Sequence, residues 1–338
     1  MRAVALGDDG RLEVVDKADP VAGPDEVVVA VERCGICGSD LHLKASGLLP
    51  RGAVLGHELS GTVVEVGEQV AGRPALGQRV SVLPARRCGA CDRCRAGEGH
   101  LCPAQALTAI GLGANDGGYA ERVRVPARSC HPLPDPVTAE AGALVEPYAV
   151  GLHAVGRSRA AGNPDVSVGV IGAGPIGLMC LAALRRFGVE RMTVAEPRPR
   201  RAAVAEALGA EVVGDAARLA PAAGGPLDVV FDAAGGLDTP SLALQAARPG
   251  GQVVLVGAPA IGSDVPMPGL LWVVKEVDFA PAIAYTDEEF AAAAACVTAG
   301  AVDSDLVVSD VRPLDAAQRS FEELSGADAP AKVMLAPS

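Results

Sequence analysis

The sequence of 338 residues is poor in aromatic side chains, with one Trp, three Tyr and five Phe, or 3% of the total. So few aromatics leave little surface on which nucleic-acid bases could stack. The chain also lacks positive charge, since its formal net charge is −12 and its pI is near 4.9. Because nucleic-acid affinity depends on neutralising phosphates, we expect no nucleic-acid partner.

A long uninterrupted hydrophobic run is also missing. The most apolar stretch, residues 166–184, contains four glycines and one proline and is short for a membrane span. The first fifteen residues carry no signal-peptide pattern. We therefore expect no membrane partner and a cytoplasmic location. There, the nine cysteines would be reduced and available as ligands rather than paired in disulfides.

Residues 1 to about 135 predict mostly strands. Residues 27–31 form a continuous apolar run, and two further candidate strands follow at 61–66 and 78–83, each bounded by Gly, Pro or polar turns. Short strands with this spacing are typical of a small barrel or a folded-over sheet. From residue 138 the pattern becomes helical, and we expect Pro147 to interrupt that helix.

The pattern changes again near residue 165, where strands and helices begin to alternate. The apolar run at 273–279 is a candidate for one more strand. This alternation predicts a parallel, doubly wound sheet in a separate domain. The other predicted strands are 166–171, 192–195, 228–232 and 252–256, and the predicted helices between them are 175–187, 200–208 and 241–247.

The first strand-to-helix turn of this region carries the dinucleotide-binding pattern G-x-G-x-x-G. Gly172 permits the tight turn, Gly174 lets the backbone approach a pyrophosphate, and Gly177 lets the helix pack on the strand. Pro175 and Ile176 open the helix, whose free N–H groups would bind the anion. We therefore predict that these five residues bind a dinucleotide.

The end of the second strand bears on the choice between NAD and NADP. Glu196 can bind a ribose 2′-hydroxyl and would repel a 2′-phosphate, which favours NAD. Arg198, Arg200 and Arg201 favour the opposite choice, because arginine is the usual phosphate partner. On balance we predict a preference for NAD.

Four cysteines with the spacing C-x2-C-x2-C-x7-C occur in a Gly-rich, charged segment, and they predict a metal site. Three kinds of site fit: a structural zinc, an iron–sulfur cluster, or a nucleic-acid-binding zinc ribbon. The final spacing of seven is unusual for a ferredoxin, and the acidic chain disfavours a ribbon. We favour a structural zinc held by Cys88, Cys91, Cys94 and Cys102.

Residues 34–58 contain a second set of chemically active groups. Cys37 and His57 could supply a thiolate and an imidazole to a zinc ion that keeps one position open for substrate. Ser39 and His42 are close enough to Cys37 in sequence to handle a proton. Each residue alone could equally be a buried or hydrogen-bonded core group.

Glu146 lies in an otherwise apolar segment, LVEPY. A carboxylate in such surroundings is costly unless it is paired or bound to a cation. Glu146 is therefore either a partly exposed residue at a helix start or a third metal ligand.

These motifs, in this order, resemble the zinc-dependent medium-chain dehydrogenases/reductases of the alcohol dehydrogenase superfamily. GICGSDLH with GHE, the four-cysteine loop, LVEPYAVGLHA and GAGPIG carry the resemblance over nearly the whole chain. LVEP resembles the sorbitol and polyol dehydrogenases, and KEVDFAPAIAYTDEEF the butanediol dehydrogenases. Ala284 stands where many sorbitol dehydrogenases have an arginine before the tyrosine, which puts a sugar-polyol substrate in question.

The resemblance implies an α/β chain of two domains. A GroES-like β-barrel catalytic domain would comprise residues 1–150 and 286–338, and a Rossmann dinucleotide-binding domain residues 151–285. It also implies a homodimer or homotetramer. Val256, Gly257, Arg201 and Lys332 would complete the cofactor site, the last through the phosphates.

In the catalytic domain, the resemblance implies a zinc held by Cys37, His57 and Glu146, the last directly or through water. Glu58 would be an adjacent carboxylate, and Asp40 would orient His57. Ser39 and His42 would pass the substrate hydroxyl proton to solvent.

We thus predict a zinc-dependent, NAD(H)-linked oxidoreductase with two zinc ions per chain, one catalytic and one structural. It would interconvert a secondary alcohol, of diol, polyol or amino alcohol type, and its ketone by hydride transfer. Two alternatives stay open: an NADP-linked ketone reductase of the same fold, and a non-catalytic, cofactor-binding regulatory protein.

Overall fold

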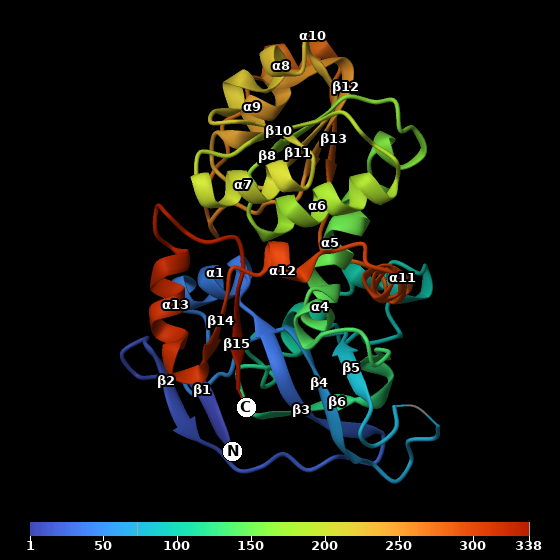
Figure 1. Cartoon of the computed structure of the whole chain (residues 1–338), viewed down its shortest axis with the longest axis vertical. Helices are drawn as coiled ribbons and strands as arrows, with labels where there is room; N and C mark the ends of the chain where they lie inside the picture. The colour runs from blue at the N-terminus through green and yellow to red at the C-terminus, as the bar shows by residue number, and fades with distance from the viewer. Residues whose placement is uncertain (73, 338) are drawn as a thin grey trace. The chain divides into compact units, whose positions relative to one another are not determined.

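The computed structural model describes residues 1–72 and 74–337, which form two compact units (Figure 1). Among the described residues, the first unit comprises those within 1–146, 285–326 and 332–337, and the second comprises residues 147–284 and 327–331. The C-terminal part of the chain therefore belongs to the unit in which the chain begins. No helix in the described ranges combines the length and the apolar character needed to cross a bilayer.

A seven-stranded sheet forms the centre of the first unit, in the order β14-β15-β3-β4-β5-β7 with β6 paired to β3. All neighbours are antiparallel except β14 and β15. The core of this unit consists mainly of Val, Ala and Leu, as the scarcity of aromatics requires. The strands are β3 (Glu26–Gly35), β4 (Glu58–Val66), β5 (Arg79–Val82), β6 (Arg122–Pro126), β7 (Cys130–Pro132), β14 (Asp310–Pro313) and β15 (Val333–Ala336).

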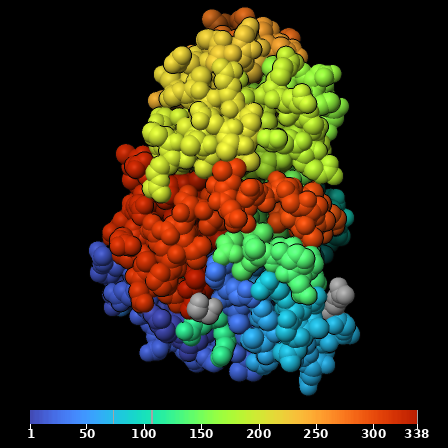
Figure 2. All heavy atoms as spheres, viewed as in Figure 1, coloured from blue at the N-terminus to red at the C-terminus, as the bar shows by residue number. Residues whose placement is uncertain are grey.

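The N-terminal hairpin, β1 (Arg2–Leu6) with β2 (Leu12–Asp16), packs against residues from the C-terminal part of the same unit. Leu12 N donates to Gln318 Oε1 at 2.9 Å, and Figure 2 shows the red C-terminal residues against the blue N-terminal ones. Helices of this unit are α1 (Gly38–Ser46), α2 (Asp92–Arg95), α3 (Gln105–Thr108), α4 (Ala139–Ala143), α11 (Asp287–Thr298), α12 (Ser304–Val307) and α13 (Ala317–Leu324).

The second unit is a six-stranded parallel sheet in the order β10-β9-β8-β11-β12-β13. The order reverses direction between β8 and β11, as in a Rossmann fold, and ligands bind at the carboxyl ends of the strands there. Its elements are β8 (Val168–Ile171), α6 (Pro175–Arg186), β9 (Met192–Ala195), α7 (Pro199–Ala207), β10 (Glu211–Val213), α8 (Leu219–Ala222), β11 (Leu227–Asp232), α9 (Thr239–Ala246), β12 (Ala247–Leu255), α10 (Gly269–Lys275) and β13 (Asp278–Pro281).

Two local expectations need correction. The helical break lies at Leu144, and Pro147 lies inside the first turn of α5 (Val145–Gly156), where a missing N–H removes no helical hydrogen bond. The run at 273–279 is not one strand: its first part belongs to α10, which ends at Glu276 in a left-handed conformation (φ 49°). The strand begins only at Asp278. An apolar run this short does not distinguish a helix from a strand.

Candidate metal centres and cofactor-binding turn

The stretch after β3 forms a hydrogen-bonded frame around His57. Cys37 is the N-cap of α1, and its backbone N–H donates to Asp40 Oδ2 at 2.9 Å. The other carboxylate oxygen of Asp40 lies 3.4 Å from Nδ1 of His57. Tyr119, fully buried, donates from its hydroxyl to Asp40 Oδ2 at 2.7 Å. Asp40 therefore lies against the Nδ1 edge of the His57 ring, so that Nε2 is the nitrogen on the side away from this carboxylate.

The ligand atoms of Cys37, His57 and Glu58 all lie within 4.8 Å of one another. Burial alone would lower the pKa of His57, but Asp40 and Cys37 raise it well above its usual value. Glu58 Oε1 is buried and has no hydrogen-bond partner among the described residues. A thiol, an imidazole and a carboxylate facing one small volume, with an acceptor left unsatisfied, fit a zinc ion.

A buried lysine from the end of the chain lies against this cluster. The ammonium of Lys332 pairs with Glu58 Oε2 and donates to the carbonyl of Ile36 at 3.0 Å. The side chains meet over Gly35, where a Cβ would collide with Glu58 Oε2 and approach Lys332 Cε to 2.8 Å. Antiparallel pairing of Met334 with Gly35 brings Lys332 to this position. Burial opposes the charge, but Glu58 and Cys37 together raise the pKa of Lys332.

Glu146 is also buried, yet it stands outside the tight group formed by Cys37, His57 and Glu58. Its Oε1 accepts a hydrogen bond of 2.7 Å from the hydroxyl of Tyr285. Burial raises the pKa of Glu146 to about 7, while His57 lowers it and Glu58 raises it. The carboxylate is thus near enough to interact electrostatically with the cluster, which keeps it a candidate ligand.

The proton-transfer candidates lie on the first turns of α1. Ser39 Oγ is 3.4 Å from Nε2 of His57, so its hydroxyl reaches the edge of the metal cluster. His42 is exposed to solvent. A proton arriving at Ser39 would thus have an exposed imidazole on the same helix.

The four-cysteine loop brings its thiols together. The Sγ atom of Cys88 lies 3.9 Å from that of Cys94 and 3.6 Å from that of Cys102, and all four sulfurs lie within 4.8 Å of one another. Tetrahedral zinc with Zn–S bonds of 2.3 Å requires sulfurs ~3.8 Å apart. The pKa of Cys102 is lowered to about 6, mainly because its thiol accepts a hydrogen bond from the backbone N–H of Cys88. The space between these sulfurs suits one ion rather than a multi-iron cluster.

The dinucleotide-binding turn has the predicted geometry. Gly172 has a φ of 93°, which a side chain would strain. A Cβ on Gly177 would collide with the carbonyl oxygen of Gly172. Gly174 is the N-cap of α6, followed by Pro175 and Ile176. The free N–H groups of this helix end lie at the carboxyl edge of the sheet, a geometry that suits a pyrophosphate.

The other predicted cofactor residues of this unit lie after β9 and β12 and, for Arg201, in α7. Glu196, buried after β9, accepts from the backbone N–H of Ala173 and of Arg198, both at 2.9 Å. Arg201 Nε donates to the carbonyl of Pro330 at 3.1 Å. The N–H groups of Val256 and Gly257, after β12, donate to the carbonyl of Asp232 at 2.9 and 2.8 Å.

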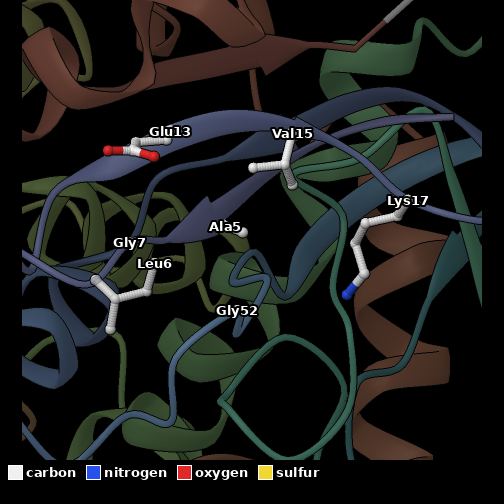
Figure 3. Close-up of a pocket in the computed structure, with 7 residues that line it drawn as sticks. All are labelled: Ala5, Leu6, Gly7, Glu13, Val15, Lys17 and Gly52. Atoms are coloured by element: carbon white, nitrogen blue, oxygen red, sulfur yellow. The ribbon is translucent and has the colours of Figure 1, made fainter.

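No sequence pattern predicts that the hydroxyl of Tyr119 binds Asp40 or that the hydroxyl of Tyr285 binds Glu146, because each carboxylate is far along the chain. From the sequence, Tyr119 is only a candidate lining residue of a substrate pocket or a packing residue, and all three tyrosines of the chain are buried. A separate small pocket lies on the N-terminal hairpin (Figure 3). Its lining, which includes Glu13, Lys17 and Gly52, shares no residue with either metal group.

Known proteins share this architecture. Residues 23–135 match the family "Alcohol dehydrogenase GroES-like domain", and residues 175–299 match "Zinc-binding dehydrogenase". A "Sorbitol dehydrogenase" of Arabidopsis thaliana is 39% identical over 70% of this chain and 68% of that enzyme.

Two solved structures are similar over almost their whole length. A putative zinc-binding dehydrogenase from Sinorhizobium meliloti, bound to NADP, is 32% identical, covers 99% of both chains and has a TM-score of 0.91. A 2R,3R-butanediol dehydrogenase from Bacillus subtilis is 30% identical, covers 100% of this chain and 99% of its own, and has a TM-score of 0.87.

A GroES-like unit in which a thiol, an imidazole and a carboxylate converge, joined in one chain to a Rossmann unit, defines a zinc- and nicotinamide-dependent oxidoreductase. The chain belongs to the zinc-dependent medium-chain dehydrogenases/reductases, as an alcohol/polyol dehydrogenase that interconverts an alcohol and its ketone.

Proposed function

We propose that the protein oxidises a secondary alcohol of diol, polyol or amino alcohol type, and reduces the matching ketone, with a zinc ion held by Cys37, His57 and Glu146. The observation that carries this proposal is the convergence of the Cys37, His57 and Glu58 ligand atoms within 4.8 Å, with His57 and Glu58 buried and Cys37 partly so. Zinc at that place would lower the pKa of a substrate hydroxyl and so make the alcohol a better hydride donor.

The chain's own residues supply the remaining functions. Asp40 holds the ring of His57, and Ser39 accepts the substrate proton and passes it toward the exposed His42. Glu58 stays beside the metal ligands, held by Lys332. At the four-cysteine loop, Cys88, Cys91, Cys94 and Cys102 would hold a second, structural zinc.

For the cofactor, we favour NAD over NADP. Glu196 is buried at the end of β9 and accepts from Ala173 N–H in the glycine turn, so its negative charge is close to the pyrophosphate-binding turn. A 2′-phosphate would bring two further negative charges against this carboxylate. The NADP in the Sinorhizobium meliloti relative makes a direct comparison of both cofactors essential.

A homodimer or homotetramer is the proposed assembly. Helix α10 exposes Leu270, Val273 and Val274, at 80%, 74% and 70%, together with part of Trp272. The adjacent β13 ends the parallel sheet among the described strands. Exposed apolar patches of this kind mark protein interfaces. Light scattering after size exclusion should give two or four chains, and Val273→Lys should shift the protein toward the monomer.

The test of the reaction is a turnover screen of diols, polyols, amino alcohols and their ketones with NAD and NADP. Turnover of secondary alcohols with NAD at least threefold more efficient than with NADP supports the proposal. An NADP-preferring ketone reductase would reverse that ratio. A regulatory protein would bind cofactor and turn over no compound of the panel.

A further inference from the structure

Arg87 connects the four-cysteine loop to a residue near the catalytic metal ligands. It directly precedes Cys88, and its side chain is largely buried, with 12% exposed. One guanidinium nitrogen donates to the carbonyl oxygen of Tyr285 at 2.6 Å. Another pairs with the carboxylate of Asp287, at the start of α11. The side chain of Arg87 therefore binds a residue at each end of the turn that leads into α11.

The four-cysteine loop in turn holds Arg87 in place. A Cβ on Gly99, which lies between Cys94 and Cys102, would approach Arg87 Cδ to 2.6 Å and Nε to 3.1 Å. The side chain thus runs across the Cα of Gly99. Between residues 88 and 102 only Gly99 and Cys102 are buried, so the loop has almost no apolar packing with which to keep this contact. An ion bound by the thiols of the loop would keep this contact in place.

Tyr285, whose carbonyl oxygen is bound by Arg87, makes the next contacts in this series. Its hydroxyl donates to Glu146 Oε1 at 2.7 Å, and its ring lies 5.6 Å from that of Phe290. The preceding residue, Ala284, has a φ of 52°, a left-handed conformation that is strained for a non-glycine residue. Such a conformation persists only where surrounding contacts over-determine it, and the two contacts of Arg87 lie immediately after it.

From this chain of contacts we propose that Arg87 and Tyr285 are positioning residues for Glu146, so that the four-cysteine loop sets the geometry of the catalytic metal site and not only the stability of its own segment. Tyr285 binds one oxygen of the carboxylate and so restricts the positions that the other oxygen can take. This inference rests on the proposed function, since it assumes that Glu146 serves the catalytic zinc. Partners of metal ligands usually change metal affinity about 10–100-fold when removed.

The experiment measures zinc release from the full-length, zinc-loaded protein to a chromophoric chelator, a readout independent of turnover. The catalytic-site phase is the one that His57→Ala eliminates. We expect Arg87→Gln and Tyr285→Phe each to accelerate that phase about tenfold. The double variant should be no faster than the faster single one, because the two residues act in series. In steady state, both single variants should lower kcat more than they raise KM.

Arg93→Gln is the matched control. It removes an exposed arginine from the same loop, one that pairs with Glu98 and has no contact with Tyr285, and it should leave the catalytic-site phase unchanged. If Arg87→Gln does not accumulate as folded protein, Arg87→Lys and Tyr285→Phe are measured instead. Lysine keeps the positive charge but cannot make the two hydrogen bonds of the forked guanidinium group.

An unchanged catalytic-site phase in Arg87→Gln or its lysine counterpart, or accelerations that multiply in the double variant, would overturn the inference while leaving the proposed function intact. A wild-type protein without any phase sensitive to His57→Ala would overturn both.

Discussion

The ammonium of Lys332 pairs with the carboxylate of Glu58 although both side chains are completely buried. The pair joins the last strand of the chain to the stretch that carries the metal ligands. We predict that Lys332→Met lowers the free energy of unfolding by about 3–5 kcal/mol, because it strands a buried carboxylate. Urea unfolding of the zinc-loaded protein measures this loss.

The double variant Glu58→Gln/Lys332→Met should recover much of that loss, since it removes both charges. Arg93→Gln, which breaks an exposed pair, should leave the free energy of unfolding almost unchanged. Equal losses in the single and double variants would show that Lys332 stabilises the fold by packing rather than by pairing with Glu58.

Cys91→Ser tests the four-cysteine loop. We expect about one zinc per chain instead of two, and faster proteolysis within residues 88–102, because the loop buries almost nothing of its own. Cys296→Ser, which changes a partly exposed free cysteine outside both metal groups, is the control and should keep both ions. An undiminished zinc content in Cys91→Ser would contradict the four-thiolate site.

Stability at acidic pH should depend on Asp228. Partial burial opposes its ionisation, but hydrogen bonds from Arg248 and Ser167 outweigh this and lower its pKa to about 2. Since the folded pKa lies below the unfolded value of about 3.9, the stabilisation is present above pH 4 and is lost as the pH falls toward 2.

Asp228→Asn should therefore be less stable than wild type at pH 5, with the difference shrinking at pH 3. Solvent screening of this partly exposed group keeps the effect small. Urea midpoints at the two pH values measure it, and a difference independent of pH would exclude Asp228 as its source.

Glu196→Gln tests the basis of cofactor choice. Removal of the charge should lower the ratio of kcat/KM with NAD to that with NADP about tenfold, ~1.4 kcal/mol of discrimination. Glu190→Gln, an exposed substitution shortly before β9, should leave the ratio unchanged. A ratio that stays constant in Glu196→Gln would assign the preference to other residues, among them Arg198 and Arg201.

The sequence predicts those parts of the site in which the chemistry requires particular residue types at a fixed, short spacing. The spacing of Cys88 to Cys102 and the glycines of the turn before α6 carry their function in a few adjacent positions. Periodicity likewise predicts most strands of the second unit. It fails at residues 273–279, where the left-handed Glu276 divides a single apolar run into a helix and a strand.

Contacts that support the ligands have no such pattern. Tyr285 and Glu146 are 139 positions apart, and Tyr119 and Asp40 are 79 apart. Only the fold brings these pairs together. For Lys332 the sequence predicts a contact with cofactor phosphates, whereas the structure pairs its ammonium with Glu58. A cofactor role for Lys332 stays a prediction.

The central claim is that Cys37, His57 and Glu146 hold the zinc on which turnover depends. Metal analysis of His57→Ala beside the wild type tests it most directly. We predict about two zinc per wild-type chain and about one in His57→Ala, with alcohol turnover abolished and binding of the reduced cofactor, followed by its fluorescence, retained. A His57→Ala protein that keeps both zinc ions and its turnover would contradict a zinc site at His57.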